Sequence, residues 1–419
     1  MPPGRMPEAL RRIIRANRAG TRAAIPSVCS AHPEVLRASL LLAETLDREI
    51  CIEATSNQVN PDGGYTGLTP ADFATLVHRI ADEAGVSRDR IILGGDHLGP
   101  QAWRRQPPDA AMAKAHEMVA AYVEAGFRKI HLDCSEGCAG EPAQLGDTVT
   151  AARSAALART ATAGDTNLLF VIGTEVPPPG GARTDEEGEI PATRPEAARA
   201  TLDAHRSAFR DLTPLIGGLV VQPGVEFSPM QVHALPMDRD PHLLAALDDW
   251  PGLCLEAHST DYQRPEVYPR LAELGFAFQK VGPALTFAYR QALYALDRIA
   301  TAMVCDGAGL EQAMERLMCA APGHWQSHYT TEPLRLQRHY GLADRIRYYW
   351  PHPEAQAAVS RLIATLPGHL PDPLLRDFTD PNARARAESL PGTFAQRLVL
   401  AYVQEALAPY FFDRGETQP

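Results

Sequence analysis

The sequence predicts an α/β protein, a TIM (β/α)8 barrel with a helical C-terminal extension. Eight short apolar runs recur at intervals of roughly 30 to 45 residues, and helical patterns fill the gaps between them. Nearly every run ends in a polar or glycine-rich cluster, as is typical of the face of a TIM barrel that carries the active site. A doubly wound open sheet is the alternative, but so many polar strand ends favour a closed barrel.

Each predicted strand is a short apolar run bounded by turn-forming residues. The eight strands are Ala23–Ser30, Glu49–Ser56, Arg90–Asp96, Lys129–Asp133, Leu168–Glu175, Gly217–Gln222, Gly252–Ala257 and Phe276–Gly282. The helices between them include Pro33–Asp47, Pro70–Ala84, Asp109–Ala125, Pro195–Asp211 and Thr286–Met303. Three of these helices begin with proline, which suits a first helical turn. Thr69 is the expected N-cap of the helix from Pro70, and Gly85 its C-terminal stop.

The pattern changes after Met303, where no further strand is expected. We therefore expect a barrel domain at 1–303 and a helical region at 304–419. The predicted helices of this region are Gly309–Cys319, Ala343–Trp350, His352–Leu366 and Thr393–Ala408. The polar stretch Asp377–Ala387 is expected to be a loop or an exposed helix end, and the acidic stretch 185–189 a solvated loop.

Bulk properties exclude several classes of partner. The chain has 419 residues and a formal net charge of −11, which disfavours nucleic acid or an anionic membrane as the main partner. It contains no long apolar run and no secretory signal pattern at its N-terminus. The seven cysteines are scattered, and the pair Cys134 and Cys138 has no second pair to complete a zinc knuckle. We expect a cytoplasmic protein with reduced thiols, and a homo-oligomer.

The polar strand ends carry side chains suited to metal chemistry. They are Asp96 and His97 on the third strand, Asp133 on the fourth, Glu175 on the fifth, Gln222 on the sixth and His258 on the seventh. Histidines on separate strands together with a carboxylate are typical of a catalytic divalent-metal site with an open position. Asp96, beside a ligand, would then serve as the general base. His131 lies deeper on its strand and is expected to be structural, and Glu175 could be a ligand or orient one.

Two further features bear on the chemistry. The stretches Pro178–Gly181, Ser259-Thr260 and Gly282–Ala284 could expose backbone N–H groups to a phosphate, although glycines are also ordinary turn formers. Only three lysines occur, and among them only Lys280 could act inside the barrel, since Lys129 lies at a strand start. A Schiff-base aldolase is therefore disfavoured. Kinase chemistry is also disfavoured, because the chain has no G-x-x-x-x-G-K-[ST] segment.

Eight longer motifs carry a family resemblance. They are IPSVCSAHP (25–33), EATSNQVN (53–60), GGDHLGP (94–100), GTEVP (173–177), VQPGVEF (221–227), EAHSTDYQ (256–263), KVGPALT (280–286) and DRIRYYWP (344–351). Together they closely resemble the accessory subunit of class II D-tagatose-1,6-bisphosphate aldolase, the GatZ/KbaZ family. The resemblance covers almost the whole chain. It implies a TIM barrel of the class II aldolase superfamily, and a subunit needed for full activity and stability of a separate catalytic subunit.

More distantly, the strand ends resemble those of class II ketose-bisphosphate aldolases, and this implies a site. Asp96 and His97 match the base and a zinc ligand, and His258 matches a second ligand. The third histidine of those enzymes is replaced by Gln222, so Glu175 or Gln222 would complete the set. The cofactor would be a divalent metal, Zn2+ first, with Mn2+, Co2+ or Ni2+ as alternatives. Substrate contacts would come from Asn57, Gln58, Gly180, Gly181, Ser259, Thr260, Asp261, Lys280 and Gly282.

Three functions follow from these residues. The first is a class II aldolase-like component acting on a ketohexose phosphate or bisphosphate, with or without a catalytic aldolase subunit. Asp96 would move the proton, and Asp133 or Asp261 would position substrate hydroxyls. The second is a stand-alone C4 epimerase of a ketose or ketose phosphate, which would use the same metal and base for retro-aldol cleavage and re-addition. The third is a purely structural subunit that stabilises a partner aldolase through its helical tail.

Overall fold

Eight parallel strands form a closed barrel in the computed structural model, which describes residues 5–174, 190–304, 309–329 and 332–413. The strand order around the barrel is β1-β10-β9-β6-β5-β4-β3-β2. The strands are β1 (Ile25–Cys29), β2 (Ile50–Thr55), β3 (Ile91–Leu98), β4 (Lys129–Leu132), β5 (Leu169–Gly173), β6 (Ile216–Val220), β9 (Cys254–Ala257) and β10 (Phe276–Val281). All eight predicted strands are therefore confirmed.

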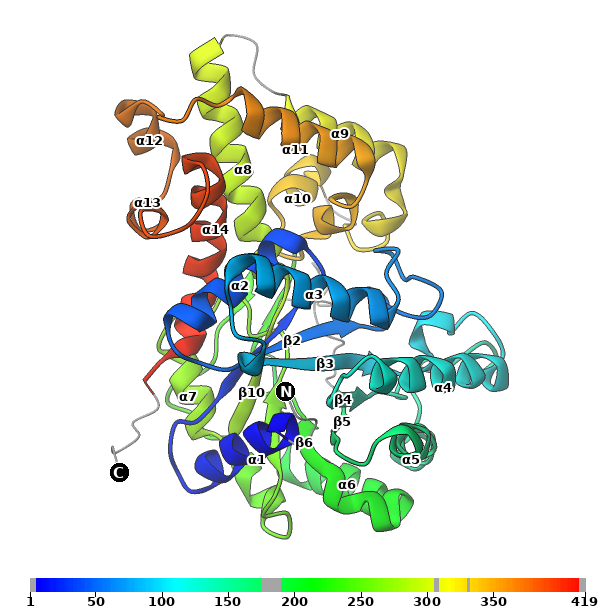
Figure 1. Cartoon of the computed structure of the whole chain (residues 1–419). Coiled ribbons are helices and arrows are strands. Elements are labelled where there is room, and N and C mark those ends of the chain that lie inside the picture. The colour runs from blue at the N-terminus through cyan, green and yellow to red at the C-terminus, as the bar shows by residue number, and fades with distance from the viewer. Residues whose placement is uncertain (1–4, 175–189, 305–308, 330–331, 414–419) are drawn as a thin grey trace.

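Five of the seven barrel helices in the described part of the chain were predicted from the sequence pattern. The seven are α2 (Pro33–Thr45), α3 (Pro70–Ala84), α4 (Pro108–Glu124), α5 (Asp147–Gly164), α6 (Pro195–Phe209), α7 (Val267–Glu273) and α8 (Pro283–Val304) (Figure 1). The predicted bounds of α3 are confirmed, because Thr69 and Asp72 form a capping box and Gly85 takes a left-handed conformation at φ 69°. A short antiparallel hairpin of β7 (Glu226–Phe227) and β8 (Val232–His233) was not predicted.

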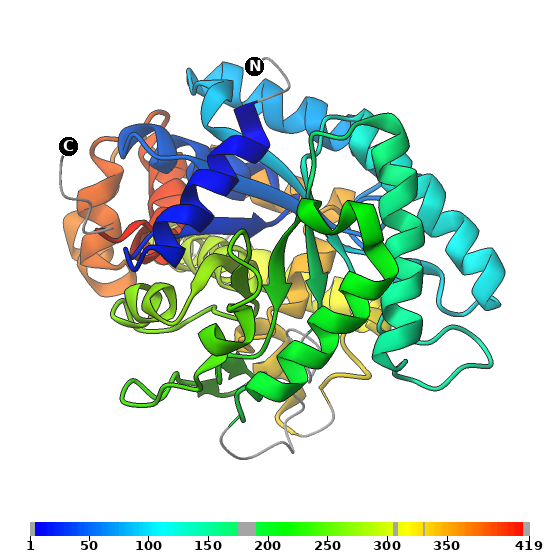
Figure 2. The same cartoon turned by 90° about the horizontal axis from the view of Figure 1, so that it is seen from below.

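An N-terminal helix closes the bottom of the barrel. This helix, α1 (Arg5–Arg18), lies across the barrel end that faces the viewer in Figure 2. Its apolar side chains, Leu10 and Ile13 among them, share one buried cluster with Val171 and Phe278 inside the barrel. The apolar contacts therefore seal the bottom of the barrel, and the barrel opens at the opposite end.

The C-terminal region is helical, as expected, and folds back on the barrel. Its helices are α9 (Leu310–Ala320), α10 (Leu334–Tyr340), α11 (Pro353–Thr365), α12 (Asp372–Phe378), α13 (Pro381–Ala387) and α14 (Phe394–Leu407). Helix α14 packs against α2 and α8, so the last helix returns to the barrel wall (Figure 1). A domain boundary at residue 303 stays a prediction.

Two expectations for this region are wrong. The stretch Ala343–Trp350 forms only a short 3₁₀ helix, Arg345–Tyr349, because Asp344 before it has a positive φ of 47°. The polar stretch Asp377–Ala387 contains the end of α12 and all of α13, where Asp380 caps the helix and Ala383 and Ala387 are buried. Among the described residues, no helix is long and apolar enough to cross a membrane.

Candidate functional site

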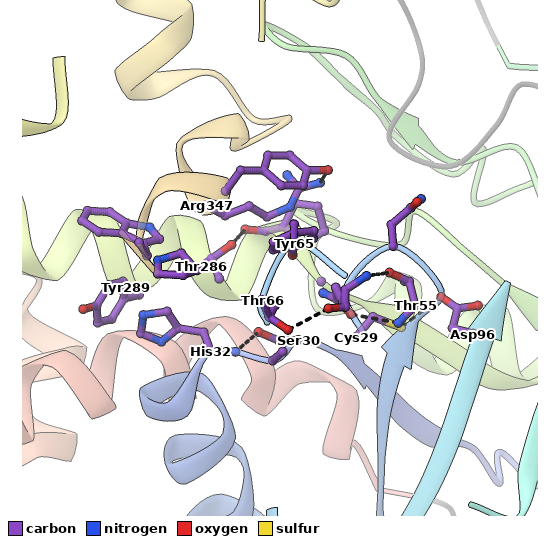
Figure 3. Close-up of a pocket in the computed structure, with 18 of the residues that line it drawn as sticks. Cys29, Ser30, His32, Thr55, Tyr65, Thr66, Asp96, Thr286, Tyr289 and Arg347 are labelled. Atoms are coloured by element: carbon purple, nitrogen blue, oxygen red, sulfur yellow. Dashed lines mark hydrogen bonds between the residues drawn. The ribbon is translucent and has the colours of Figure 1, made fainter. Parts of the chain in front are cut away.

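A cavity of about 630 Å3 opens at the carboxyl ends of the barrel strands. Its inner end is lined by Asp96, His97, His258 and Lys280, and its outer wall by Arg347 and other residues of the C-terminal region (Figure 3). The predicted contact residues that line it are Asn57, Gln58, Ser259, Asp261, Lys280 and Gly282. The cavity is large enough for a sugar phosphate, since small-molecule sites typically measure about 300 to 1,000 Å3.

The glycines of β3 give space to neighbouring groups. A Cβ atom on Gly94 would lie 2.8 Å from Cγ of Glu53, so the glycine makes room for a carboxylate inside the barrel. A Cβ atom on Gly99 would overlap the main-chain oxygen of Asp133. Glycine at both positions therefore lets β2, β3 and β4 approach closely around the polar cluster.

A bulge turns two consecutive residues of β3 toward the same site. Neighbours on a regular strand point to opposite faces, so Asp96 and His97 could not both face the cavity. The register between β3 and β4 shifts between Gly95 and Leu98, and His97 has a positive φ of 48°. Both side chains consequently belong to one cluster of possible metal ligands.

Charged groups fill the barrel beneath this cluster. The Lys129 ammonium lies 2.6 Å from Glu53 and 2.5 Å from Glu256. The Lys280 ammonium contacts Asp96, lies 3.0 Å from Glu53 and lies 3.4 Å from Glu256. All five groups are buried. Three carboxylates thus face two ammonium groups, and the net charge of the layer is negative.

Three histidines converge above this layer. His97 bonds through Nδ1 to the Asp133 carboxylate at 2.8 Å, and His131 bonds through Nε2 to the Gly173 carbonyl at 2.9 Å. The Asp133 carboxylate assigns the His97 proton to Nδ1, which leaves the lone pair on Nε2, 3.7 Å from Asp96. Both nitrogens of His131 have partners, because Nε2 faces the Gly173 carbonyl, and Nδ1 lies 2.9 Å from the Asp96 carboxylate and 3.2 Å from the main-chain nitrogen of His97.

His258 follows the same pattern from β9. Its Nε2 lies 2.9 Å from the Glu256 carboxylate, which assigns the lone pair to Nδ1. Burial, and then the positive charge of Lys280, lower the pKa of His258 to about 3, so the ring is neutral. A neutral imidazole with one N–H held by an acceptor is the usual form of a metal-binding histidine.

The electrostatic environment of the site favours positive charge. Burial opposes ionisation of Asp96, but the neighbouring His97 and Lys280 outweigh it and hold the pKa of Asp96 well below its usual range. Burial also opposes protonation of His97, yet Asp96 and the hydrogen bond to Asp133 raise the pKa of His97. A cluster that attracts a proton in this way also attracts a cation.

The donor set fits a divalent cation. Asp96, His97, His131 and His258 each offer a ligand atom, and these atoms lie within 4.8 Å of one another. Imidazole and carboxylate donors suit Zn2+ and other first-row divalent ions. The three histidine acceptors Asp133, Gly173 and Glu256 supply the outer contacts that such sites use to orient their ligands.

Three predicted residues have other partners. The Gln222 side-chain oxygen accepts the N–H groups of Gly224 at 2.8 Å and Val225 at 3.0 Å, and Gln222 does not line the cavity. We therefore leave it out of the ligand set. The Thr260 hydroxyl donates to the Lys280 carbonyl at 2.6 Å, outside the cavity lining.

The Asp261 carboxylate also forms hydrogen bonds within the protein. It accepts the N–H groups of Gly282 at 3.0 Å and Ala284 at 2.8 Å, at the start of α8. The backbone groups expected to bind phosphate at Gly282–Ala284 are thus occupied by a carboxylate of the protein. The predicted residues Glu175, Gly180 and Gly181 lie outside the described residues.

Sequence reasoning missed much of the inner layer. His131 was expected to be structural, but it belongs to the ligand cluster, because the stagger of β4 raises it to the level of Asp96. Lys129 was expected at a strand start far from the site, but its ammonium lies between two carboxylates in the barrel. Glu53 and Glu256 could have been predicted as members of the inner layer from the sequence, since each is a lone charged residue in an apolar strand.

The chain has close relatives among known proteins. Residues 10–413 match the family described as D-tagatose-1,6-bisphosphate aldolase subunit GatZ/KbaZ-like. A protein of Agrobacterium fabrum named D-tagatose 6-phosphate 4-epimerase is 48% identical over 426 residues, which cover 98% of this chain and 99% of that protein.

A solved structure is similar over nearly the same length. The crystal structure of a probable tagatose 6 phosphate kinase from Sinorhizobium meliloti 1021 has 45% sequence identity and a TM-score of 0.84. The match covers 93% of this chain and 99% of that one. The chain therefore belongs to the D-tagatose-1,6-bisphosphate aldolase subunit GatZ/KbaZ-like family.

Proposed function

We propose that this protein is a metal-dependent epimerase that inverts C4 of a ketohexose 6-phosphate by retro-aldol cleavage and re-addition. The observation that carries the proposal is the cluster of Asp96, His97, His131 and His258 at the closed end of the cavity. The name of the Agrobacterium fabrum relative supports the same reaction. A kinase reaction lacks support, because the chain contains no G-x-x-x-x-G-K-[ST] segment.

The proposed ligands are the three histidines, and Asp96 carries the proton. A divalent cation held there would supply Lewis-acid polarisation of the ketose carbonyl. Asp96 accepts the proton of the C4 hydroxyl while the C3–C4 bond breaks, which leaves an enediolate and an aldehyde. The aldehyde rotates, the bond re-forms on its other face, and Asp96 returns the proton to O4. No other reactant is consumed.

The surrounding charges support this role for Asp96. Lys280 contacts the carboxylate and keeps it ionised before the reaction. Lys129 pairs with both Glu53 and Glu256 below and lowers the pKa of each carboxylate, so they compete little for the same proton. Asp133 orients His97 through the 2.8 Å bond to Nδ1 and acts as a positioning residue.

The test uses the purified full chain without any partner. Elemental analysis measures bound metal, and NMR follows tagatose 6-phosphate and fructose 6-phosphate for C4 inversion, with a coupled assay for released triose phosphate. We expect interconversion of the two ketoses with little free triose. Removal of metal by a chelator should abolish the activity, and Zn2+, Mn2+, Co2+ or Ni2+ should be compared for its recovery.

Asp96→Asn is the decisive variant. We expect it to lower kcat by about 1,000-fold or more while the fold is retained, because the proton acceptor is lost. Asp248→Asn, which changes an exposed carboxylate, is the matched control and should keep full activity. Normal epimerisation by Asp96→Asn would contradict the proposed mechanism.

The family description supports a second candidate, a component of a tagatose-bisphosphate aldolase. In this case the same cleavage would end with release of both fragments, or would need a catalytic partner subunit. Stoichiometric triose release from tagatose 1,6-bisphosphate would favour an aldolase. Activity that appears only after a partner aldolase is added would favour the subunit role, and light scattering of the chain alone would give its oligomeric state.

A further inference from the structure

Only two cationic side chains of lysine or arginine line the cavity within the described part of the chain. Lys280 lies at the inner end on β10, and Arg347 lies on the outer wall in the 3₁₀ helix Arg345–Tyr349. A phosphate monoester on the substrate needs a cation or a set of N–H groups. The two cations therefore define the two places along the cavity at which a phosphate could bind.

The inner end does not suit a phosphate. Lys280 already contacts Asp96, Glu53 and Glu256, and the layer that contains it has a net negative charge. A phosphate there would be repelled by these carboxylates. The N–H groups at the start of α8 do not suit it either, because the Asp261 carboxylate already accepts them.

Arg347 is held in place by neutral acceptors. Its guanidinium donates to the main-chain oxygens of Ala343 and Asp344, the latter at 3.1 Å, and to the Tyr348 hydroxyl at 3.0 Å. Within the described ranges, no carboxylate forms an ion pair with Arg347. The Asp344 carboxylate instead accepts the Thr286 hydroxyl. Arg347 is thus oriented by the protein but not neutralised by a salt bridge.

Two tyrosines complete this wall. The rings of Tyr65 and Tyr348 pack edge to face with centroids 4.8 Å apart, and both residues line the cavity. Figure 3 shows Arg347 beside Tyr65, on the wall between His32 and Tyr289 at one end and Asp96 at the other. Burial raises the pKa of Tyr65 to about 12, so its hydroxyl stays a hydrogen-bond donor.

We propose that Arg347, with the hydroxyls of Tyr65 and Tyr348, binds the phosphate of the substrate and selects ketose phosphates over free ketoses. This inference rests on the proposed function, because it assigns the outer wall of the cavity, away from the ligand cluster, to the phosphorylated carbon. The selectivity for phosphate then comes from the C-terminal region, while the bond-breaking groups come from the barrel.

The test compares phosphorylated and free ligands on the full metal-loaded protein. Calorimetry measures the Kd of fructose 6-phosphate and of fructose for the wild type, Arg347→Gln, Arg347→Lys and Tyr65→Phe. We expect Arg347→Gln to weaken fructose 6-phosphate at least about 30-fold more than fructose, because a charged bidentate contact is lost. Arg347→Lys should fall in between, and Tyr65→Phe should weaken fructose 6-phosphate by about 3- to 10-fold.

Arg316→Gln is the matched control, because it removes an exposed positive charge of the same C-terminal region, on α9, that does not line the cavity. It should change both Kd values by less than about threefold. Equal weakening of both ligands by Arg347→Gln, or no weakening at all, would overturn the subsite. If Arg347→Gln unfolds, Arg347→Lys and Tyr65→Phe still decide the question, since both keep the 3₁₀ helix contacts to a larger extent.

The outcome for the subsite is separable from that for the reaction. If fructose 6-phosphate binds through Arg347 but is not epimerised, the subsite stands and the proposed epimerase function fails. If the wild type epimerises fructose 6-phosphate and Arg347→Gln leaves the preference for it over fructose intact, the function stands and the subsite fails.

Discussion

At the residue scale, the site depends on how single polar groups are paired inside an apolar barrel. Buried charges are costly unless each is compensated, and here Lys129 and Lys280 lie among Glu53, Glu256 and Asp96. The pairing leaves an excess of negative charge beside three imidazoles. This excess is the physical reason that the cluster suits a cation, whichever divalent ion is preferred.

Asp344 is a buried residue whose charge costs stability. Burial, countered in part by Arg347 and the Thr286 hydroxyl, raises the pKa of Asp344 to about 7. An unfolded aspartate has a pKa of about 3.9, so between these values the folded state holds a proton that the unfolded state releases. The free energy of unfolding should therefore fall as the pH rises through this window.

Asp344→Asn should remove this dependence, because an amide does not ionise. We expect the advantage of the variant over the wild type to be about 2 to 3 kcal/mol larger at pH 8 than at pH 5, by urea denaturation at both values, because the dependence acts over about two pH units between pH 5 and the folded pKa. Asp377→Asn, an exposed residue, is the control and should leave the pH dependence as it is. A wild type whose stability does not fall between these pH values would contradict the assignment.

At the element scale, the junction of β3 and β4 decides the geometry of the cluster. The bulge between Gly95 and Leu98 brings Asp96 and His97 to one face, and it requires a close approach of the two strands. Gly99, directly after β3, lies close to the next strand, because a Cβ atom there would overlap the Asp133 oxygen. The strand pair therefore tolerates no side chain at this position.

Gly99→Ala should destabilise the fold and disturb the site together. We expect a loss of about 1 to 3 kcal/mol in the free energy of unfolding and a large fall in bound metal, since the backbone of Asp133 must shift. Gly146→Ala is the matched control: a Cβ atom there meets nothing within 4 Å, and its φ is −75°. Denaturation and elemental analysis of both variants check this, and equal behaviour of the two would refute the close-approach argument.

At the scale of the whole molecule, the C-terminal region is joined to the barrel through its last helix. Helix α14 packs on α2 and α8, and Gln404 donates to the Ala38 carbonyl at 3.0 Å. The Tyr410 hydroxyl reaches the Thr260 carbonyl at 3.1 Å near the site. The region is thus both a wall of the cavity and a cover for apolar faces of barrel helices.

A chain that ends at residue 392 should not form a stable barrel. It lacks α14, whose buried residues Leu398, Leu400 and Val403 cover the helices below. Large apolar surfaces would then be exposed to water, at a cost of roughly 25 cal/mol per Å2. We expect an aggregated or partly unfolded product by gel filtration and circular dichroism, whereas the full chain unfolds in one calorimetric transition. A folded, monomeric truncated barrel would instead support independent domains.

The sequence predicted the barrel well because its signals are local. Eight apolar runs, the capping box at Thr69 and the left-handed Gly85 each depend on a few neighbouring residues. The polar ends of the strands also brought Asp96, His97 and His258 into one expected site. Helix α5 was not predicted, because its apolar residues follow no clear helical pattern and its sequence therefore gives little local signal.

By itself, then, the sequence determined the fold class and the order of the barrel strands, and it predicted three members of the candidate site, because periodicity and strand ends are encoded in short stretches. Only the tertiary structure decided which residues meet. The stagger of β4 brings His131 beside Asp96, the bulge in β3 turns His97 inward, and the returning C-terminal region places Arg347 on the cavity wall. These contacts join residues far apart in the chain, and such distances are fixed by barrel closure and packing.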